Sequence, residues 1–140
     1  MKKTVQVVYW DASAILSALV EDDHTDQALE WLRKTGAHVV SSLSYAEVLA
    51  VFERLRRSGV VSERLVDRSL DGLERGPWQR LDLQPDWGDI RFLGSKWSLR
   101  GADLWHLSTA LALRRETGQL ILLTFDKRLR VAAQGVGMSE

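Results

Sequence analysis

The sequence VQVVYWDASA, residues 5–14, is an apolar run that ends in an acidic residue, Asp11. Valine and aromatic residues dominate the run, and only Gln6 interrupts it. A short run of this kind is typical of a strand that is covered on both faces of a parallel sheet. We therefore predict a central strand over Val5–Trp10, with Asp11 at its carboxyl end.

Three further stretches are predicted to be strands. Leu120–Phe125 is a second apolar run and predicts another central parallel strand. Ala37–Ser41 and Arg80–Leu83 are shorter, and each follows a break that contains glycine. These four stretches are the expected strands of one sheet.

Helical patterns separate the expected strands. Alternating strands and helices predict right-handed crossovers and a parallel sheet with helices on both faces. In such sheets ligands bind beyond the carboxyl ends of the strands, so the chemistry is expected there. The predicted helices are Ser13–Leu19, Thr25–Lys34, Ser44–Arg57, Ser62–Arg75, Trp87–Trp97, Ala102–Thr117 and Lys127–Gln134.

The composition is that of one folded domain. The chain has 140 residues, and 45% of them are hydrophobic, so we expect a single domain over residues 1–140. Its 19 basic and 19 acidic residues cancel, which excludes attraction to nucleic acid or membrane by bulk charge. Cysteine is absent, which excludes disulfides and thiolate metal sites. We expect a cytoplasmic protein without a signal peptide or membrane span.

Two acidic residues follow the two predicted central strands. Asp11 comes directly after Val5–Trp10, and Asp126 directly after Leu120–Phe125. Each could simply cap the helix that follows it, which is a common role of aspartate. Because both fall at the same edge of the predicted sheet, a shared chemical role is the competing interpretation.

Glu47 lies near the start of a predicted helix that follows the strand Ala37–Ser41. Its spacing from Ser44 is that of a capping box, and the apolar stripe of the helix leaves Glu47 off the buried side. Periodicity alone favours a cap. The position of Glu47 near the same sheet edge as Asp11 keeps a functional role open.

Asp103 lies on the apolar side of its predicted helix, where its side chain projects between those of Leu107 and Ala110 on the helix surface. An unpaired carboxylate on such a face is very costly, so it must be capped, paired or bound to a cation. His106 follows one turn later, and we interpret it as a hydrogen-bonded core histidine and not as a metal ligand.

Four converging carboxylates would repel one another and raise one another's pKa values, which favours a bound cation. Oxygen ligands point to Mg²⁺ or Mn²⁺, because zinc prefers histidine or cysteine and His24, His38 and His106 show no ligand spacing. Such ions hold water that can attack a phosphodiester. Phosphodiester hydrolysis is therefore the chemistry that fits.

Four separated motifs together resemble the PIN-domain family, and in particular the VapC-type toxins of toxin–antitoxin pairs. The resemblance covers nearly the whole chain, and the order and spacing of the motifs make it specific. The motifs are YWDASA at 9–14, SYAEV at 44–48, GADLWHL at 101–107 and LTFDKRL at 123–129.

This resemblance implies a PIN-like three-layer α/β fold, with a parallel sheet of four or five strands flanked by helices. It also implies a homodimer, endoribonuclease activity that depends on Mg²⁺ or Mn²⁺, and inhibition by a cognate antitoxin. The acidic family positions fall on Asp11, Glu47, Asp103 and Asp126, which replaces the cap interpretation of Glu47. Ser13 and Thr124 fall on supporting hydroxyl positions. Few residues follow the last predicted helix, so a final edge strand is expected to be very short or absent.

RNA would also need cations beside these acids. Arg100, just before Asp103, is the best placed, and Lys127, Arg128 and Arg54 are further candidates for phosphate contacts. Any one of them could instead be an ordinary solvated side chain.

Two other classes of protein compete with a nuclease. A phosphatase of the haloacid-dehalogenase type would carry a second aspartate where this chain has Ser13, and a phosphoacceptor receiver domain would need an acidic pair after the first strand. The other class is a non-catalytic PIN-like module that binds RNA or protein. Four filled acidic positions argue against a decayed site.

Overall fold

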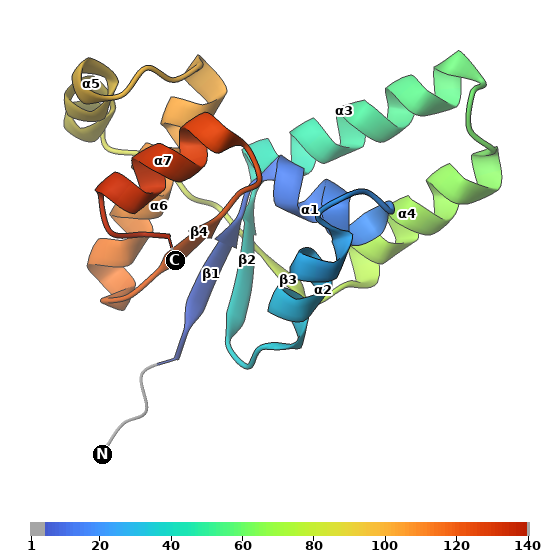
Figure 1. Cartoon of the computed structure of the whole chain (residues 1–140), viewed down its shortest axis with the longest axis horizontal. Helices are drawn as coiled ribbons and strands as arrows, with labels where there is room; N and C mark the ends of the chain where they lie inside the picture. The colour runs from blue at the N-terminus through green and yellow to red at the C-terminus, as the bar shows by residue number, and fades with distance from the viewer. Residues whose placement is uncertain (1–4, 140) are drawn as a thin grey trace.

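A computed structural model describes residues 5–139, and Figure 1 shows a central sheet between two groups of helices. In this part of the chain the sheet has four strands, all parallel, in the order β3-β2-β1-β4. The strands are β1 (Val7–Trp10), β2 (Ala37–Ser41), β3 (Trp78–Leu81) and β4 (Ile121–Leu123).

The helices cover both faces of the sheet. Helices α1 to α4 pack on one face, and α5 to α7 pack on the other (Figure 1). The three-layer α/β architecture predicted from the sequence is confirmed. The helices are α1 (Ala12–Leu19), α2 (Thr25–Arg33), α3 (Ser42–Ser58), α4 (Glu63–Arg75), α5 (Trp87–Lys96), α6 (Gly101–Thr117) and α7 (Lys127–Gly135).

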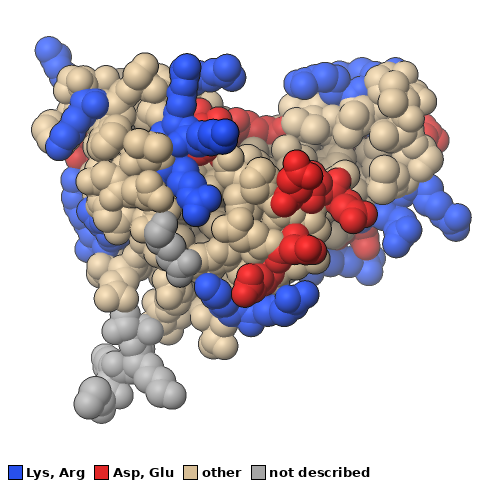
Figure 2. All heavy atoms as spheres, in the orientation of Figure 1, with Lys and Arg blue, Asp and Glu red and all other residues tan. Residues whose placement is uncertain are grey.

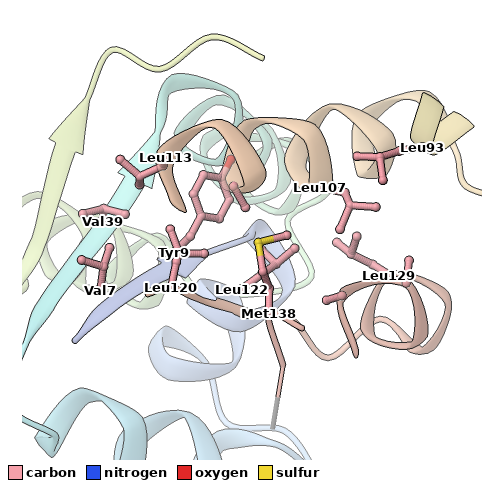
Figure 3. Close-up of a cluster of buried hydrophobic side chains, with 13 residues drawn as sticks. Val7, Tyr9, Val39, Leu93, Leu107, Leu113, Leu120, Leu122, Leu129 and Met138 are labelled. Carbon is pink, nitrogen blue, oxygen red and sulfur yellow. The ribbon is translucent and has the colours of Figure 1, made fainter. Parts of the chain in front are cut away.

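The central strand β1 supplies both halves of the core. Val7 and Tyr9 point into the cluster under α5, α6 and α7 (Figure 3), whereas Val8 and Trp10 point into the cluster under α1 to α4. Successive strand residues face opposite sides of a sheet, so a strand covered on both faces must be apolar at every position. This explains why the run before Asp11 carries no alternation of polar and apolar residues.

Hydroxyl and carboxylate side chains begin most of the helices. Asp11, Ser41, Ser62, Asp86 and Asp126 each accept a hydrogen bond from a main-chain N–H in the first turn of the helix that follows. The cap interpretation of Asp11 and Asp126 is therefore correct as far as local structure goes. It leaves open what else these two carboxylates do.

The cap predicted for α3 is wrong in position. Ser41 accepts from the main-chain nitrogen of Ser44 at 3.1 Å, so the helix begins at Ser42 and no capping box joins Ser44 to Glu47. Ser44 instead donates to the carbonyl oxygen of Trp10 at 2.9 Å. A tertiary partner on β1 has replaced the local one.

Strand β3 lies two residues earlier than predicted. It spans Trp78–Leu81 because the Trp78 ring packs edge-on against Trp10, with ring centroids 5.5 Å apart, and places Trp78 opposite His38. The short pattern Arg80–Leu83 contained no sign of this aromatic contact.

The tail after α7 returns to the outer strand. The main-chain nitrogen of Leu122 donates to the carbonyl oxygen of Met138 at 2.7 Å, and the Met138 side chain is buried in the core. No fifth strand forms within residues 5–139, as expected from the shortness of the tail. Within the same residues, no helix has both the length and the apolar character needed to cross a membrane.

Candidate active site

The carboxyl ends of β1 and β4 bring Asp11 and Asp126 to one edge of the sheet. Trp10 lies opposite Leu123 in the paired strands, and the main-chain nitrogen of Asp11 donates to the carbonyl oxygen of Leu123 at 3.2 Å. Each aspartate then begins a helix, Asp11 at α1 and Asp126 at α7. Strand pairing alone therefore explains why residues so distant in sequence share this edge.

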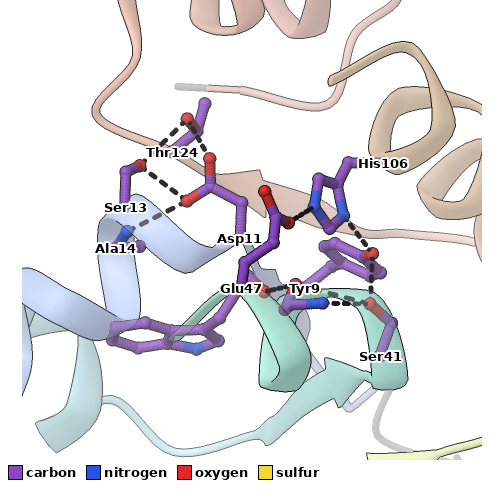
Figure 4. A network of polar contacts seen from close by, with 10 residues as sticks. Tyr9, Asp11, Ser13, Ala14, Ser41, Glu47, His106 and Thr124 are labelled. Carbon is purple, nitrogen blue, oxygen red and sulfur yellow. Dashed lines mark hydrogen bonds and ion pairs between the residues drawn. The ribbon is translucent and has the colours of Figure 1, made fainter. Parts of the chain in front are cut away.

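Three donors surround the Asp11 carboxylate (Figure 4). Thr124 donates its hydroxyl to Oδ2 at 2.5 Å, while Ser13 Oγ and the main-chain nitrogen of Ala14 donate to Oδ1 at 2.7 and 2.9 Å. The side chain is only 4% exposed. Burial raises the pKa of Asp11 above its usual value, and the three donors act against that rise. Ser13 and Thr124, predicted to support the site, both contact Asp11 directly.

Glu47 enters the site from the second turn of α3, on the opposite side of Asp11 from Thr124 (Figure 4). Its Oε1 lies 2.6 Å from Nε2 of His106, a residue of α6 that is 1% exposed. The other ring nitrogen of His106 lies 2.7 Å from the hydroxyl oxygen of Tyr9. The interpretation of His106 as a hydrogen-bonded core histidine is confirmed.

Asp103 lies in the first turn of α6 and is half-buried. Burial raises the pKa of Asp103 above its usual value, and the negative charges of Asp126 and Glu47 raise it further, whereas His106 and Arg100 lower it. The electrostatics thus place Asp103 within range of both other acids. Asp126 is more exposed and uses Oδ1 to accept from the main-chain nitrogen of Leu129 at 3.0 Å.

All four predicted acids line one pocket of about 240 Å³, together with Ser13, Arg100 and His106. Within residues 5–139, however, no three Asp, Glu or His side chains lie close enough together to hold a metal ion. Local partners account for this spread, since hydroxyls hold Asp11, His106 holds Glu47, and the α7 cap holds Asp126. The four acids nevertheless offer carboxylate oxygens as possible ligands, and such ligands suit Mg²⁺ or Mn²⁺.

A second hollow of about 390 Å³ adjoins the acidic pocket and shares Arg100, Asp103 and Asp126 with it. Lys127, Arg128 and Phe125 complete its lining. Figure 2 shows basic side chains gathered over α7, with acidic side chains beside them. Arg54, the remaining predicted phosphate contact, lies two turns beyond Glu47 on α3 and lines neither hollow.

Two features near the site were missed by sequence reasoning. Tyr9 is a core residue of β1 whose hydroxyl reaches His106, 97 positions away. His24 stacks on Phe125 with ring centroids 4.6 Å apart and an interplanar angle of 13°. Neither pair has a local spacing that could have signalled it, because both contacts depend on how the sheet brings distant segments together.

Comparison with known proteins adds a second line of evidence. Residues 8–135 match the family model described as the PIN domain. The chain is 33% identical over 121 residues to Ribonuclease VapC3 of Mycobacterium tuberculosis, which covers 85% of this chain and 82% of that relative.

Solved structures share the fold at lower identity. VapC20 of Mycobacterium tuberculosis, described as a toxin that cleaves the sarcin–ricin loop, superimposes with a TM-score of 0.62 at 13% identity over 95% of this chain and 97% of its own. VapBC2 of Rickettsia felis, bound to a DNA fragment from its promoter, gives a TM-score of 0.60 at 15% identity over 95% of both chains. FitAcB of Neisseria gonorrhoeae gives 0.61 at 16% identity over 91% and 93%. These likenesses concern the fold alone.

Proposed function

Because the chain belongs to the PIN-domain family and is related to the VapC-type ribonucleases, we propose that it is a metal-dependent endoribonuclease and the toxin of a toxin–antitoxin pair. One observation carries the proposal. The four acids Asp11, Glu47, Asp103 and Asp126 line a single pocket at the carboxyl edge of a parallel sheet. We propose that residues 1–140 act as one nuclease domain.

The four carboxylates would hold Mg²⁺ or Mn²⁺. They come from four separate elements of the fold and supply oxygen donors only, which is the chemistry these ions prefer. Burial disfavours the ionised forms of Asp11 and Asp103, and a bound cation would offset that cost. A bound ion would supply the charge that activates water for attack on a phosphodiester and stabilises the departing oxygen.

The residues of the chain have distinct roles in this proposal. Ser13 and Thr124 orient the Asp11 carboxylate, Ser13 from the first turn of α1 and Thr124 from the position directly after β4. Their hydroxyls donate to different oxygens of Asp11, so the carboxylate is held in one orientation. Glu47 and Asp103 face it from α3 and α6.

The hollow beside the acids is suited to the RNA strand. Arg100, Lys127 and Arg128 line it, and in the described part of the chain none of the three lies in an ion pair with an acidic side chain. Unpaired guanidinium and ammonium groups bind phosphate oxygens. Phe125, already stacked on His24, offers an aromatic surface for a base. We propose that RNA phosphates next to the cut bond lie here.

A phosphatase is less well supported. The position where a haloacid-dehalogenase phosphatase would carry its second aspartate is Ser13, which donates to Asp11 and accepts from the main-chain nitrogen of Phe125 at 3.0 Å. A residue in these contacts acts as a support for Asp11. It has no carboxylate to protonate a leaving group.

Two protein partners belong to the proposal. Because the chain is related to a VapC-type ribonuclease, we propose that a cognate antitoxin binds it. We also propose a homodimer, because Trp87 and Phe92 on α5 are 89% and 61% exposed. A short gene beside this one, encoding a DNA-binding protein with a disordered tail, would supply the candidate antitoxin.

Cleavage of an unstructured RNA tests the function directly. The wild-type protein is expected to cut it with Mg²⁺ or Mn²⁺ and to lose activity with excess chelator. Asp103→Asn should remain folded and inactive. A wild-type protein that binds neither ion by calorimetry would favour the non-catalytic interpretation. A trapped phosphoenzyme would favour a phosphatase.

A further inference from the structure

A continuous network of hydrogen bonds, buried except at Glu47, runs from the acidic pocket to the end of β1 (Figure 4). Glu47 Oε1 lies 2.6 Å from His106 Nε2, and His106 Nδ1 lies 2.7 Å from the Tyr9 hydroxyl. The Tyr9 hydroxyl oxygen lies 2.9 Å from Ser41 Oγ. Ser41 lies 3.4 Å from Ser44 Oγ and accepts from the Ser44 main-chain nitrogen at 3.1 Å.

The end of this hydrogen-bond network that lies farthest from Glu47 is bound to the polypeptide backbone. Ser44 Oγ donates at 2.9 Å to the carbonyl oxygen of Trp10, the residue directly before Asp11. A carbonyl oxygen can only accept, so this bond cannot reverse. Burial raises the pKa of Tyr9 far above its usual value, so its hydroxyl stays neutral and keeps its hydrogen-bonding role. The network therefore links the position of Glu47 to the peptide that carries Asp11.

Glu47 needs such a link. Its side chain is long, partly exposed and enters a pocket that already holds three other carboxylates. Their repulsion would favour rotamers that point Glu47 into solvent. Of the described residues lining the pocket, only His106 and Arg100 can carry a positive charge, and only His106 makes a hydrogen bond to Glu47.

His106 is also well placed by its own helix. It lies three residues after Asp103 on α6, so the two side chains share one face of the helix. One helix thus supplies a carboxylate of the pocket and the group that holds a carboxylate from α3. In the tautomer with its hydrogen on Nε2, the His106 ring accepts from the Tyr9 hydroxyl at Nδ1 and donates to Glu47 from Nε2.

We infer that His106 is a positioning residue, which holds Glu47 in the pocket through a hydrogen bond at Nε2. The network of Tyr9, Ser41 and Ser44 fixes the imidazole ring at its other nitrogen, Nδ1. The contact between His106 and Glu47 rests on the geometry alone, whereas its effect on metal binding and RNA cleavage rests on the proposed function. His106 takes one oxygen of Glu47, and in the described residues Oε2 has no hydrogen-bond partner. Oε2 is thus the oxygen available to an ion.

Two substitutions of His106 separate positioning from packing. In His106→Gln the amide nitrogen stands near the place of Nε2 and can still donate to Glu47, whereas in His106→Asn it stands near the place of Nδ1 and can only meet Tyr9. Both variants replace the ring with an amide, and asparagine is one methylene group smaller than glutamine. If His106 only fills the core, the two variants should differ in stability but not in Mn²⁺ affinity.

The expected difference appears in metal binding and turnover. By calorimetry, His106→Asn should bind Mn²⁺ about 10–100-fold more weakly than wild type, which is the usual effect of losing a partner of a metal ligand, and His106→Gln within about 3-fold. The turnover number for RNA should follow the same order, with KM little changed. Equal losses in the two variants would overturn the inference.

His38 provides the matched control. It is a second buried histidine with both ring nitrogens in hydrogen bonds, to Trp10 Nε1 at 3.0 Å and the Lys34 carbonyl at 3.1 Å, but it contacts no carboxylate of the pocket. His38→Asn should lower stability without a change in Mn²⁺ affinity. If both His106 variants fail to fold, Tyr9→Phe, which keeps the ring and removes the bond to Nδ1, should weaken Mn²⁺ binding in the same direction. Unchanged affinity in Tyr9→Phe would then count against the inference.

A metal-free measurement distinguishes failure of this inference from failure of the proposed function. In the protein with selectively ¹⁵N-labelled histidine, the Nε2 resonance of His106 should shift when Glu47 is replaced in Glu47→Ala, and the His38 resonances should not. An unaffected His106 signal would overturn the inference even if the protein cuts RNA. A shifted signal would support the contact even if the protein shows no nuclease activity.

Discussion

Thr124 donates its hydroxyl to Oδ2 of Asp11 at 2.5 Å, across a separation of 113 residues. The same oxygen of Thr124 accepts from the main-chain nitrogen of Asp126 at 3.1 Å. One hydroxyl therefore connects the two acids that follow β1 and β4. This contact makes Asp11 more than a helix cap, because a cap requires only the bond from Ala14 to Oδ1.

The double role of Asp11 can be separated by two substitutions. Asp11→Asn keeps an oxygen for Ser13 and Ala14 but removes a buried charge whose pKa is raised, so without metal it should be as stable as wild type or slightly more stable. Asp11→Ala also loses the cap and should cost about 0.5–2 kcal/mol. Both should abolish RNA cleavage.

Bound metal should reverse the stability order of wild type and Asp11→Asn, so that wild type becomes the more stable protein. Wild type gains RT ln(1 + [L]/Kd), about 2.7 kcal/mol at 100 times Kd, and the variant gains less. Thermal melts with chelator and with Mg²⁺ or Mn²⁺ measure both states. An equal metal-induced shift in the two proteins would make Asp11 a cap and nothing more.

The raised pKa of Asp103 predicts a pH dependence of stability. A carboxyl whose pKa is higher in the folded protein stabilises the fold while it is protonated, and this contribution is lost as the pH rises through the folded value. Without metal, Asp103→Asn should therefore be as stable as wild type at low pH. It should become more stable than wild type as the pH rises above 3.8, the usual pKa of an aspartate. Urea unfolding over a pH series measures the difference.

Asp89 provides a control of opposite sign. A hydrogen bond from Arg115 lowers the pKa of Asp89 in the folded protein. Ionised Asp89 therefore stabilises the fold at pH values above its pKa in the unfolded chain, and this stabilisation is lost as the pH falls through the lower pKa of the folded protein. Asp89→Asn should be less stable than wild type at neutral pH, and the gap should close in acid. The same trend for Asp103→Asn would contradict the raised pKa.

The hollow beside the acids predicts the salt dependence of RNA binding. Removing one phosphate contact with Arg100→Ala or Lys127→Ala should weaken binding and make the slope of log affinity against log salt less steep by about 0.7, the single-strand value. Asp11→Asn, which is expected to be inactive, provides a background in which binding is measured without cleavage. Arg64→Ala on α4, which lines neither hollow, changes the net charge equally and should leave the slope unchanged.

The exposed aromatic residues of α5 predict the site of self-association. Trp87→Ser combined with Phe92→Ser should convert a dimer to a monomer in light scattering at micromolar concentration, since large exposed apolar side chains mark interaction surfaces. Val60→Ser is the control, because Val60 is 83% exposed at the turn between α3 and α4. A wild-type protein that is monomeric in the same experiment would refute the prediction.

Local sequence patterns were enough for the elements of the fold. The runs before Asp11 and before Asp126 each predicted a strand, because only a strand covered on both faces is apolar at every position. The first is central, as predicted, whereas β4 was also predicted to be central and lies at the edge of the sheet in the described residues. Each helix was predicted with bounds within about two residues of those observed, since apolar periodicity and capping residues act over a few neighbours. The parallel direction of the strands followed from the alternation of strands and helices, whereas their order in the sheet was not predicted.

The orientation of the acids could not be predicted in this way. Periodicity favoured a cap role for Glu47, and only the resemblance to a family assigned it to the site. The tertiary structure turned it toward His106, which lies 59 positions away. The cap that belongs to α3 is Ser41, which sits at the end of a strand and is also bonded to Tyr9.

The sequence by itself therefore determined that Asp11 and Asp126 follow strands and begin helices, and so that these two acids reach the sheet edge. Only the tertiary structure decided which oxygen of each acid is taken by a neighbour and which faces the pocket. The reason is physical. Strand and helix formation depends on neighbours within a few positions, whereas the bonds from Thr124 to Asp11 and from His106 to Glu47 exist only after the sheet has assembled and α3 and α6 have packed at its edge.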